Sequence, residues 1–64
     1  MPTIRVEMRT GRTHEQKRNL VRLVTDAVVE ALGVKSESVR IKIFEIEKHH
    51  DAIGGVLQSE KAPK

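Results

Sequence analysis

Hydrophobic and polar residues alternate near the start of the chain. Ile4, Val6 and Met8 fall on one side of an extended backbone, and the residues between them fall on the other side. A period of two residues is typical of a β-strand with one face covered. The pattern therefore predicts a strand over residues 3–8.

A helical pattern follows. Its apolar residues recur at spacings of three, four and seven, and they are Leu20, Val21, Leu23, Val24, Ala27, Val28, Ala31 and Leu32. This spacing predicts an amphipathic helix from His14 to about Leu32. Thr13 and Gln16 form a capping-box signature at its start, and Gly33 suits its end. We expect the opposite face of this helix to be solvated. Its residues are His14, Lys17, Arg18, Arg22, Asp26 and Glu30.

Alternation returns from Val39 to Phe44, which predicts a second strand. A strand, a helix and a strand in this order form a βαβ unit, and we expect its strands to be parallel. Further on, Gly54-Gly55 indicates a tight turn or short hairpin. The chain is thus predicted to be one α/β (α+β) domain over residues 1–64, with a loose polar tail over 57–64.

The composition indicates that the folded chain needs other copies of itself to be stable. The chain has 64 residues, no cysteine and a single aromatic residue, Phe44. A domain this small is marginally stable unless a disulfide, a metal or oligomerisation supports it. The lack of cysteine excludes disulfides and cysteine zinc sites. One helix covers only one face of a two-stranded sheet, so we expect a homo-oligomer with closed symmetry.

The net charge and the hydropathy exclude few classes of function. The formal net charge is +3 and the sequence pI is about 9.7, which permits small carboxylates, nucleic acid or anionic lipid as partners. The sequence has neither an apolar run long enough to span a bilayer nor an apolar signal segment at its start. We therefore expect a cytoplasmic protein with no membrane partner.

Three residues are the main candidates for chemistry. Arg12 precedes the predicted helix, whose free N–H groups favour anions, and Arg40 lies at the start of the second strand. The planar guanidinium group matches a carboxylate. Pro2 lacks an N–H, so it is tolerated at the first position of a strand. If Met1 is removed, Pro2 instead becomes a free secondary amine that exchanges protons.

The run His49-His50-Asp51 contains metal-ligand side chains. Adjacent residues on an extended strand point to opposite faces and rarely hold one ion. We therefore expect a polar loop here and no metal site.

Together these segments resemble the 4-oxalocrotonate tautomerase family of the tautomerase superfamily. The resemblance extends from Pro2 to about Val56 and is carried by the motifs PTIRVEM, GRTHEQKRNL, SVRIKIFE and AIGG. It implies an isomerase of aromatic degradation that uses no metal or organic cofactor. It also implies a homohexamer, a trimer of dimers, with active sites at subunit boundaries.

The resemblance also assigns roles to residues. It implies that Met1 is removed, that Pro2 is the catalytic base, and that Arg12 and Arg40 act on a small mono- or dicarboxylate, a 2-hydroxy-dienoate or 2-oxo acid. Desolvation and nearby guanidinium groups should lower the proton affinity of the Pro2 amine. One arginine would hold a carboxylate and the other would stabilise the enol oxygen. Substrate-binding positions are expected at Ser38 and Ile53, within the matching motifs.

Two residues depart from the family pattern. Asp51 replaces an aromatic residue and Arg9 replaces an apolar one, and both are candidate substrate-binding residues. The stretch MRTGRTHEQKR is similar to the α subunit of trans-3-chloroacrylic acid dehalogenase. The position that matches the water-activating acid of that enzyme is Ile53 in this chain, which is not an acid.

One alternative is therefore a hydratase or dehalogenase in which Asp51 activates water and Arg9 with Arg12 binds the acid. Another is a subunit of a heterohexamer. A basic nucleic-acid-binding dimer is disfavoured, because residues 39–44 alternate as a strand and aromatic stacking residues are lacking.

Overall fold

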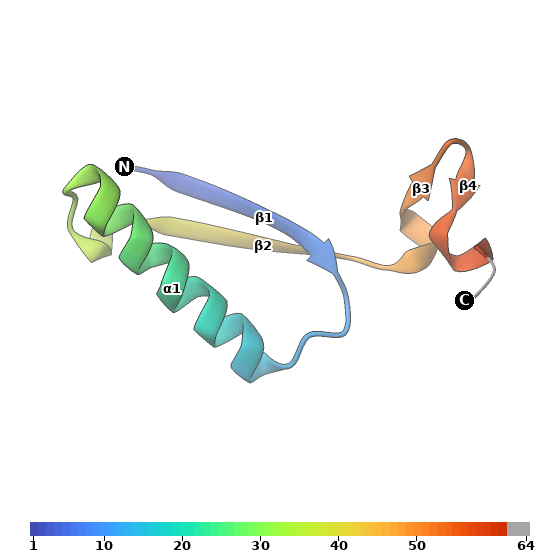
Figure 1. Ribbon diagram of the computed structural model, residues 1–64, viewed down its shortest axis with the longest axis horizontal. Helices are drawn as coiled ribbons and strands as arrows, with labels where there is room; N and C mark the ends of the chain where they lie inside the picture. The colour runs from blue at the N-terminus through green and yellow to red at the C-terminus, as the bar shows by residue number, and fades with distance from the viewer. Residues whose placement is uncertain (62–64) are drawn as a thin grey trace.

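The computed structural model describes residues 1–61. Figure 1 shows a two-stranded sheet with one long helix beside it and a short hairpin beyond the far end of the sheet. The strands and the helix, in chain order, are β1 (Thr3–Arg9), α1 (His14–Leu32), β2 (Arg40–Ile46), β3 (Ala52–Ile53) and β4 (Val56–Leu57). Single 3-10 turns are η1 (Ser36–Ser38), η2 (Lys48–His50) and η3 (Gln58–Glu60).

Strands β1 and β2 pair in parallel, with Thr3 opposite Arg40 and Arg9 opposite Ile46. The predicted parallel βαβ unit is therefore confirmed. Strand β2 begins one residue later and ends two residues later than the alternation predicts. Val39 instead closes η1, where its N–H donates to the Ser36 carbonyl at 3.1 Å.

The two faces of the sheet differ as the alternation predicts. The positions that face α1 are half-buried, and they are Ile4, Val6, Met8, Ile41 and Ile43. The other face is open to solvent. There the Arg5 guanidinium carbon lies 4.1 Å from the centroid of the Phe44 ring, a cation–π contact that joins β1 to β2.

Both predicted helix caps are present. The Thr13 hydroxyl accepts a hydrogen bond from the Gln16 N–H at 3.1 Å, and the Gln16 side-chain oxygen accepts one from the Thr13 N–H at 2.9 Å. Gly33 ends the helix at φ 68°, a left-handed conformation that favours glycine.

The predicted solvated face of α1 needs one correction. Lys17 is only half exposed, because its ammonium group reaches across to the Glu45 carboxylate of β2 at 3.1 Å. Lys17 and Glu45 thereby tie the first turn of α1 to the second strand. The long lysine stem covers apolar surface while its charge finds a partner.

The predicted hairpin is also confirmed. Strands β3 and β4 are antiparallel, with Ile53 opposite Val56. Gly54 and Gly55 connect them at φ 60° and φ 81°, as a type I′ turn requires.

The segment predicted to be a loose tail has structure in its first part. Leu57 belongs to β4, and the N–H of Gln58, the first residue of η3, donates to the Asp51 carbonyl at 2.7 Å. That bond returns the chain to the turn before β3. Residues 62–64 of the predicted tail lie outside the described part of the chain.

The single chain has no closed core. Within residues 1–61 no side chain is fully buried, and the accessible surface is 5284 Å². A compact monomer of this mass would expose about 4100 Å². The radius of gyration is 15.3 Å, against about 10.7 Å for a compact chain of this length. The protomer is therefore an open unit that leaves apolar surface for a partner. No helix in the described range is long and apolar enough to cross a bilayer.

Candidate active site

Pro2 and Arg40 lie at the same end of the sheet. The Arg40 N–H donates to the Pro2 carbonyl at 3.0 Å, so the backbone of Arg40 fixes the residue that precedes β1. Pro2 is half-buried. Met1, directly before it, is 84% exposed.

The Arg40 side chain lies on the open face of the sheet. It is exposed, and by alternation along β2 it shares the face of Lys42 and Phe44, opposite α1. The guanidinium group is thus presented away from the helix of its own chain.

Arg12 lies beyond the other end of β1. It is exposed in the loop between β1 and α1, directly before the helix cap. The seven residues of β1 separate this loop from Pro2, a length of about 20 Å for extended backbone. Figure 1 shows the N-terminus and this loop at opposite ends of β1. One protomer therefore does not bring Pro2 and Arg12 together.

Arg9 and Asp51 form an ion pair. An Arg9 guanidinium nitrogen donates to a carboxylate oxygen of Asp51 at 2.9 Å, and the two side chains are 34% and 41% exposed. The pair joins the end of β1 to the segment before β3. The two residues that depart from the family pattern thus contact each other, across 42 positions of sequence.

The remaining two candidates occupy different surroundings. The Ser38 hydroxyl donates to the Lys35 carbonyl at 2.8 Å and closes η1. Ile53 is 70% exposed beside the hairpin turn. Within residues 1–61 neither side chain forms a hydrogen bond or ion pair with Arg9 or Asp51.

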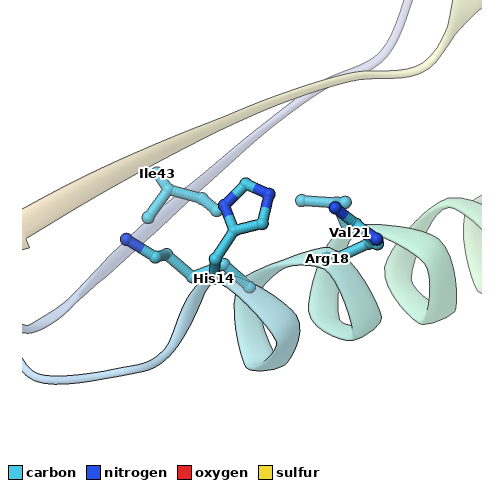
Figure 2. A pocket seen from close by; sticks show the side chains of 5 residues that line it. His14, Arg18, Val21 and Ile43 are labelled. Carbon is cyan, nitrogen blue, oxygen red and sulfur yellow. The ribbon is translucent and has the colours of Figure 1, made fainter.

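A groove of about 380 Å³ lies between the first turns of α1 and β2. Figure 2 shows the His14 ring extending from the start of α1 toward Ile43 on β2. The groove is lined by His14, Lys17, Arg18, Val21 and Ile43. The helical pattern treats the first three as solvated, whereas they frame this groove beside the Arg12 loop. Its apolar floor comes from the predicted inward positions of helix and strand.

A family model described as "Tautomerase enzyme" matches residues 2–61. This chain belongs to the tautomerase family. The 2-hydroxymuconate tautomerase of Bacillus subtilis (strain 168) is 49% identical to it over 60 residues, which are 94% of this chain and 97% of the relative. The residue range of the match includes Pro2, Arg12 and Arg40.

Solved structures of tautomerases share the fold. The crystal structure of a homologue of 4-oxalocrotonate tautomerase superposes with a TM-score of 0.90 at 44% identity, covering 95% of this chain and 100% of that one. A heterohexameric 4-oxalocrotonate tautomerase from Chloroflexus aurantiacus superposes at 0.85 with 35% identity, covering 94% and 97%. The α+β tautomerase fold expected from the resemblance is confirmed.

Sequence reasoning missed two features of this tautomerase. It treated Arg9 and Asp51 as separate departures, whereas they pair. It also placed His49 and His50 in a polar loop without predicting that Lys48–His50 form the 3-10 turn η2. The sequence did contain one signal for the pair. Arg9 and Asp51 both depart from the family pattern, and their charges are opposite.

Proposed function

We propose that this chain is a cofactor-independent tautomerase of 2-hydroxy-dienoates or 2-oxo acids, with Pro2 as its general base. The observation that carries the proposal is the match over residues 2–61, which begins at Pro2. The relative named 2-hydroxymuconate tautomerase covers nearly the same span and indicates the substrate class.

The proposed step moves one proton. The amine of Pro2 accepts the proton of the substrate's 2-hydroxyl group and returns a proton to a carbon of the conjugated chain. The double bonds shift, and a 2-oxo acid forms with no net gain or loss of atoms. A base serves best when its pKa lies near the working pH, because it must both take and give the proton.

The step requires removal of Met1. While Met1 is attached, the Pro2 nitrogen belongs to an amide and has no useful basicity. The high exposure of Met1 supports its removal. The half-buried position of Pro2 supports partial desolvation of the freed amine, which disfavours its charged form.

Arg12 and Arg40 are proposed to bind the anionic ends of the substrate. One holds a carboxylate through a bidentate contact, and the other stabilises the charge that develops on the enol oxygen. Because Arg12 lies a strand's length from Pro2 of its own chain, a second copy must supply it. We therefore propose a homohexamer, a trimer of dimers, with its sites at the boundaries between copies.

The hairpin is proposed to complete each site. Ile53 and Val56 are 70% and 50% exposed, and a hairpin that projects from the unit can cover the site of a neighbouring copy. Ser38, two residues before Arg40, is proposed to contact substrate through its hydroxyl oxygen. Because the Asp51 charge is compensated by Arg9, the pair favours a role in holding the hairpin over activation of water.

The test is ketonisation of 2-hydroxymuconate by Pro2→Ala, followed by ultraviolet absorbance. Removal of Met1 would leave a primary amine in this variant, so we expect kcat/KM to fall about ten- to a hundredfold without vanishing. Pro63→Ala is the matched control for a change of proline and should retain full activity. Equal activity of Pro2→Ala and the original chain would refute the assignment of the base.

A further inference from the structure

The turn η2 and Glu47, the residue directly before it, bring together metal-ligand side chains, two of which extended backbone would separate. Ligand atoms of Glu47, His49 and His50 all lie within 4.8 Å of one another, and all three residues are exposed. In a 3-10 turn successive side chains are about 120° apart around the axis, whereas along a strand they point to opposite faces. The sequence-based argument against a metal site therefore does not apply to this turn.

We propose that Glu47, His49 and His50 form a surface site for a divalent transition-metal ion of the zinc type. Two imidazoles and one carboxylate are a donor set that zinc accepts, with water in the fourth position. Asp51, the acid adjacent in sequence, is not a member, because it is bonded to Arg9.

The distances are within reach of coordination. Zinc bonds of about 2.1 Å in a tetrahedron place ligand atoms about 3.4 Å apart. The two imidazole centroids are already 4.3 Å apart, with the ring planes at 65°, and a His49 ring nitrogen lies 3.9 Å from a Glu47 oxygen. All three side chains are exposed and free to rotate, so the remaining gap from within 4.8 Å can close without movement of the backbone.

The backbone that carries the ligands is held at both ends. Before the turn, β2 ends at Ile46, whose carbonyl accepts a hydrogen bond from the Thr10 N–H at 3.2 Å. Within it, the His50 N–H donates to the Glu47 carbonyl at 2.9 Å. After it, the Asp51 side chain binds Arg9 and its carbonyl accepts from Gln58. Metal binding therefore orders only side chains, which limits its entropic cost.

One charge opposes binding. Lys48 lies between Glu47 and His49 in the sequence of the turn and brings an ammonium group near the site. Its long stem lets the charge turn into solvent. Within one chain the site is separate from the proposed base, because η2 follows the end of β2 that is opposite to Pro2 (Figure 1).

The experiment is a calorimetric titration of the untagged protein with zinc chloride in metal-free buffer. We expect one zinc ion per chain, and at least tenfold weaker binding in His49→Ala and in His50→Ala. His14→Ala is the matched control, since it removes the other histidine of the chain, and its affinity should be unchanged. Magnesium chloride should give no binding, because imidazoles suit zinc and not magnesium.

Amide chemical shifts provide an independent readout. Zinc should displace the signals of residues 47–51 and leave those of α1 in place. Three results would each overturn the site: no heat and no shift at millimolar zinc, equal affinity in the His49→Ala/His50→Ala double variant, or shifts that centre on His14. Ketonisation by the histidine variants should be unchanged, so failure of this site is distinguishable from failure of the proposed function.

Discussion

Arg12 and Arg40 are both exposed, and within one chain they lie near opposite ends of the two-stranded sheet. If they bind the substrate's anionic ends, Arg12→Ala and Arg40→Ala should each cost about 2–5 kcal/mol of transition-state binding. That corresponds to a fall in kcat/KM of about 30- to 5000-fold. Steady-state ketonisation of 2-hydroxymuconate measures it.

The matched control is Arg22→Ala, an exposed arginine of α1 within 4.0 Å of Asp26. Its kcat/KM should remain at the original value. Arg12→Lys and Arg40→Lys should recover only part of the loss, because an ammonium group lacks the bidentate fork. If both alanine variants keep full kcat/KM, the two arginines are not part of the site.

The Arg9–Asp51 pair makes a separate prediction at the residue scale. Its groups are a third or more exposed, so solvent and salt screen it and we expect a coupling of about 0.2–1 kcal/mol. A double-mutant cycle with Arg9→Ala and Asp51→Ala, read by urea unfolding, measures this coupling. The coupling should shrink in high salt. A value of zero at low salt would show that the pair does not hold the hairpin segment.

At the scale of elements, the capping box fixes where α1 begins, directly after the loop that carries Arg12. Thr13→Ala removes the hydroxyl that accepts from Gln16 and should destabilise the protein by about 1 kcal/mol. Thr13→Ser keeps the hydroxyl and is the matched control, with a loss well below that of alanine. Thermal unfolding compares the variants. Equal melting temperatures for the alanine and serine variants would contradict the role of the cap.

The main elements were predictable because their signals are local. Period-two alternation placed β1 and β2, helical spacing placed α1, and the capping residues marked both helix ends. Paired glycines placed the hairpin turn. Each of these features depends on residues within a few positions of one another, so the sequence pattern alone contains it.

The parts that were not predictable depend on contacts distant in sequence or on weak local preferences. Arg9 meets Asp51, and Lys17 meets Glu45, only after the sheet has formed. The turn η2 has no glycine or proline to mark it, so the polar loop expected at His49 and His50 carried no prediction of a 3-10 turn. The ordered segment after Leu57 depends on the Gln58–Asp51 hydrogen bond, which no local pattern announces.

At the scale of the whole molecule, one chain leaves its sheet open and its apolar side chains exposed. Phe44 is 38% exposed on the face opposite α1. If partner chains cover this face, a carboxylate placed on it loses its hydration without gaining an ion-pair partner, which destabilises the assembly. Phe44→Glu should therefore reduce the proposed hexamer to smaller species and reduce ketonisation with it.

Sedimentation equilibrium measures the mass of the assembly. Asn19→Glu adds a negative charge at an exposed position of α1 and is the matched control. This variant should keep the same number of protomers in the assembly as the original protein. A Phe44→Glu protein that keeps both its mass and its activity would show that this face is not an interface. A monomeric, fully active original protein would contradict the shared site.

The most direct test of the central claim is the intact mass of the purified, active protein. Pro2 can act as a base only when its nitrogen is a free amine, so we expect a mass lower than that of the full sequence by one methionine residue. Chains that retain Met1, separated or prepared with a blocked N-terminus, should be inactive in ketonisation. Full activity in a preparation whose measured mass still includes Met1 would contradict the role of Pro2.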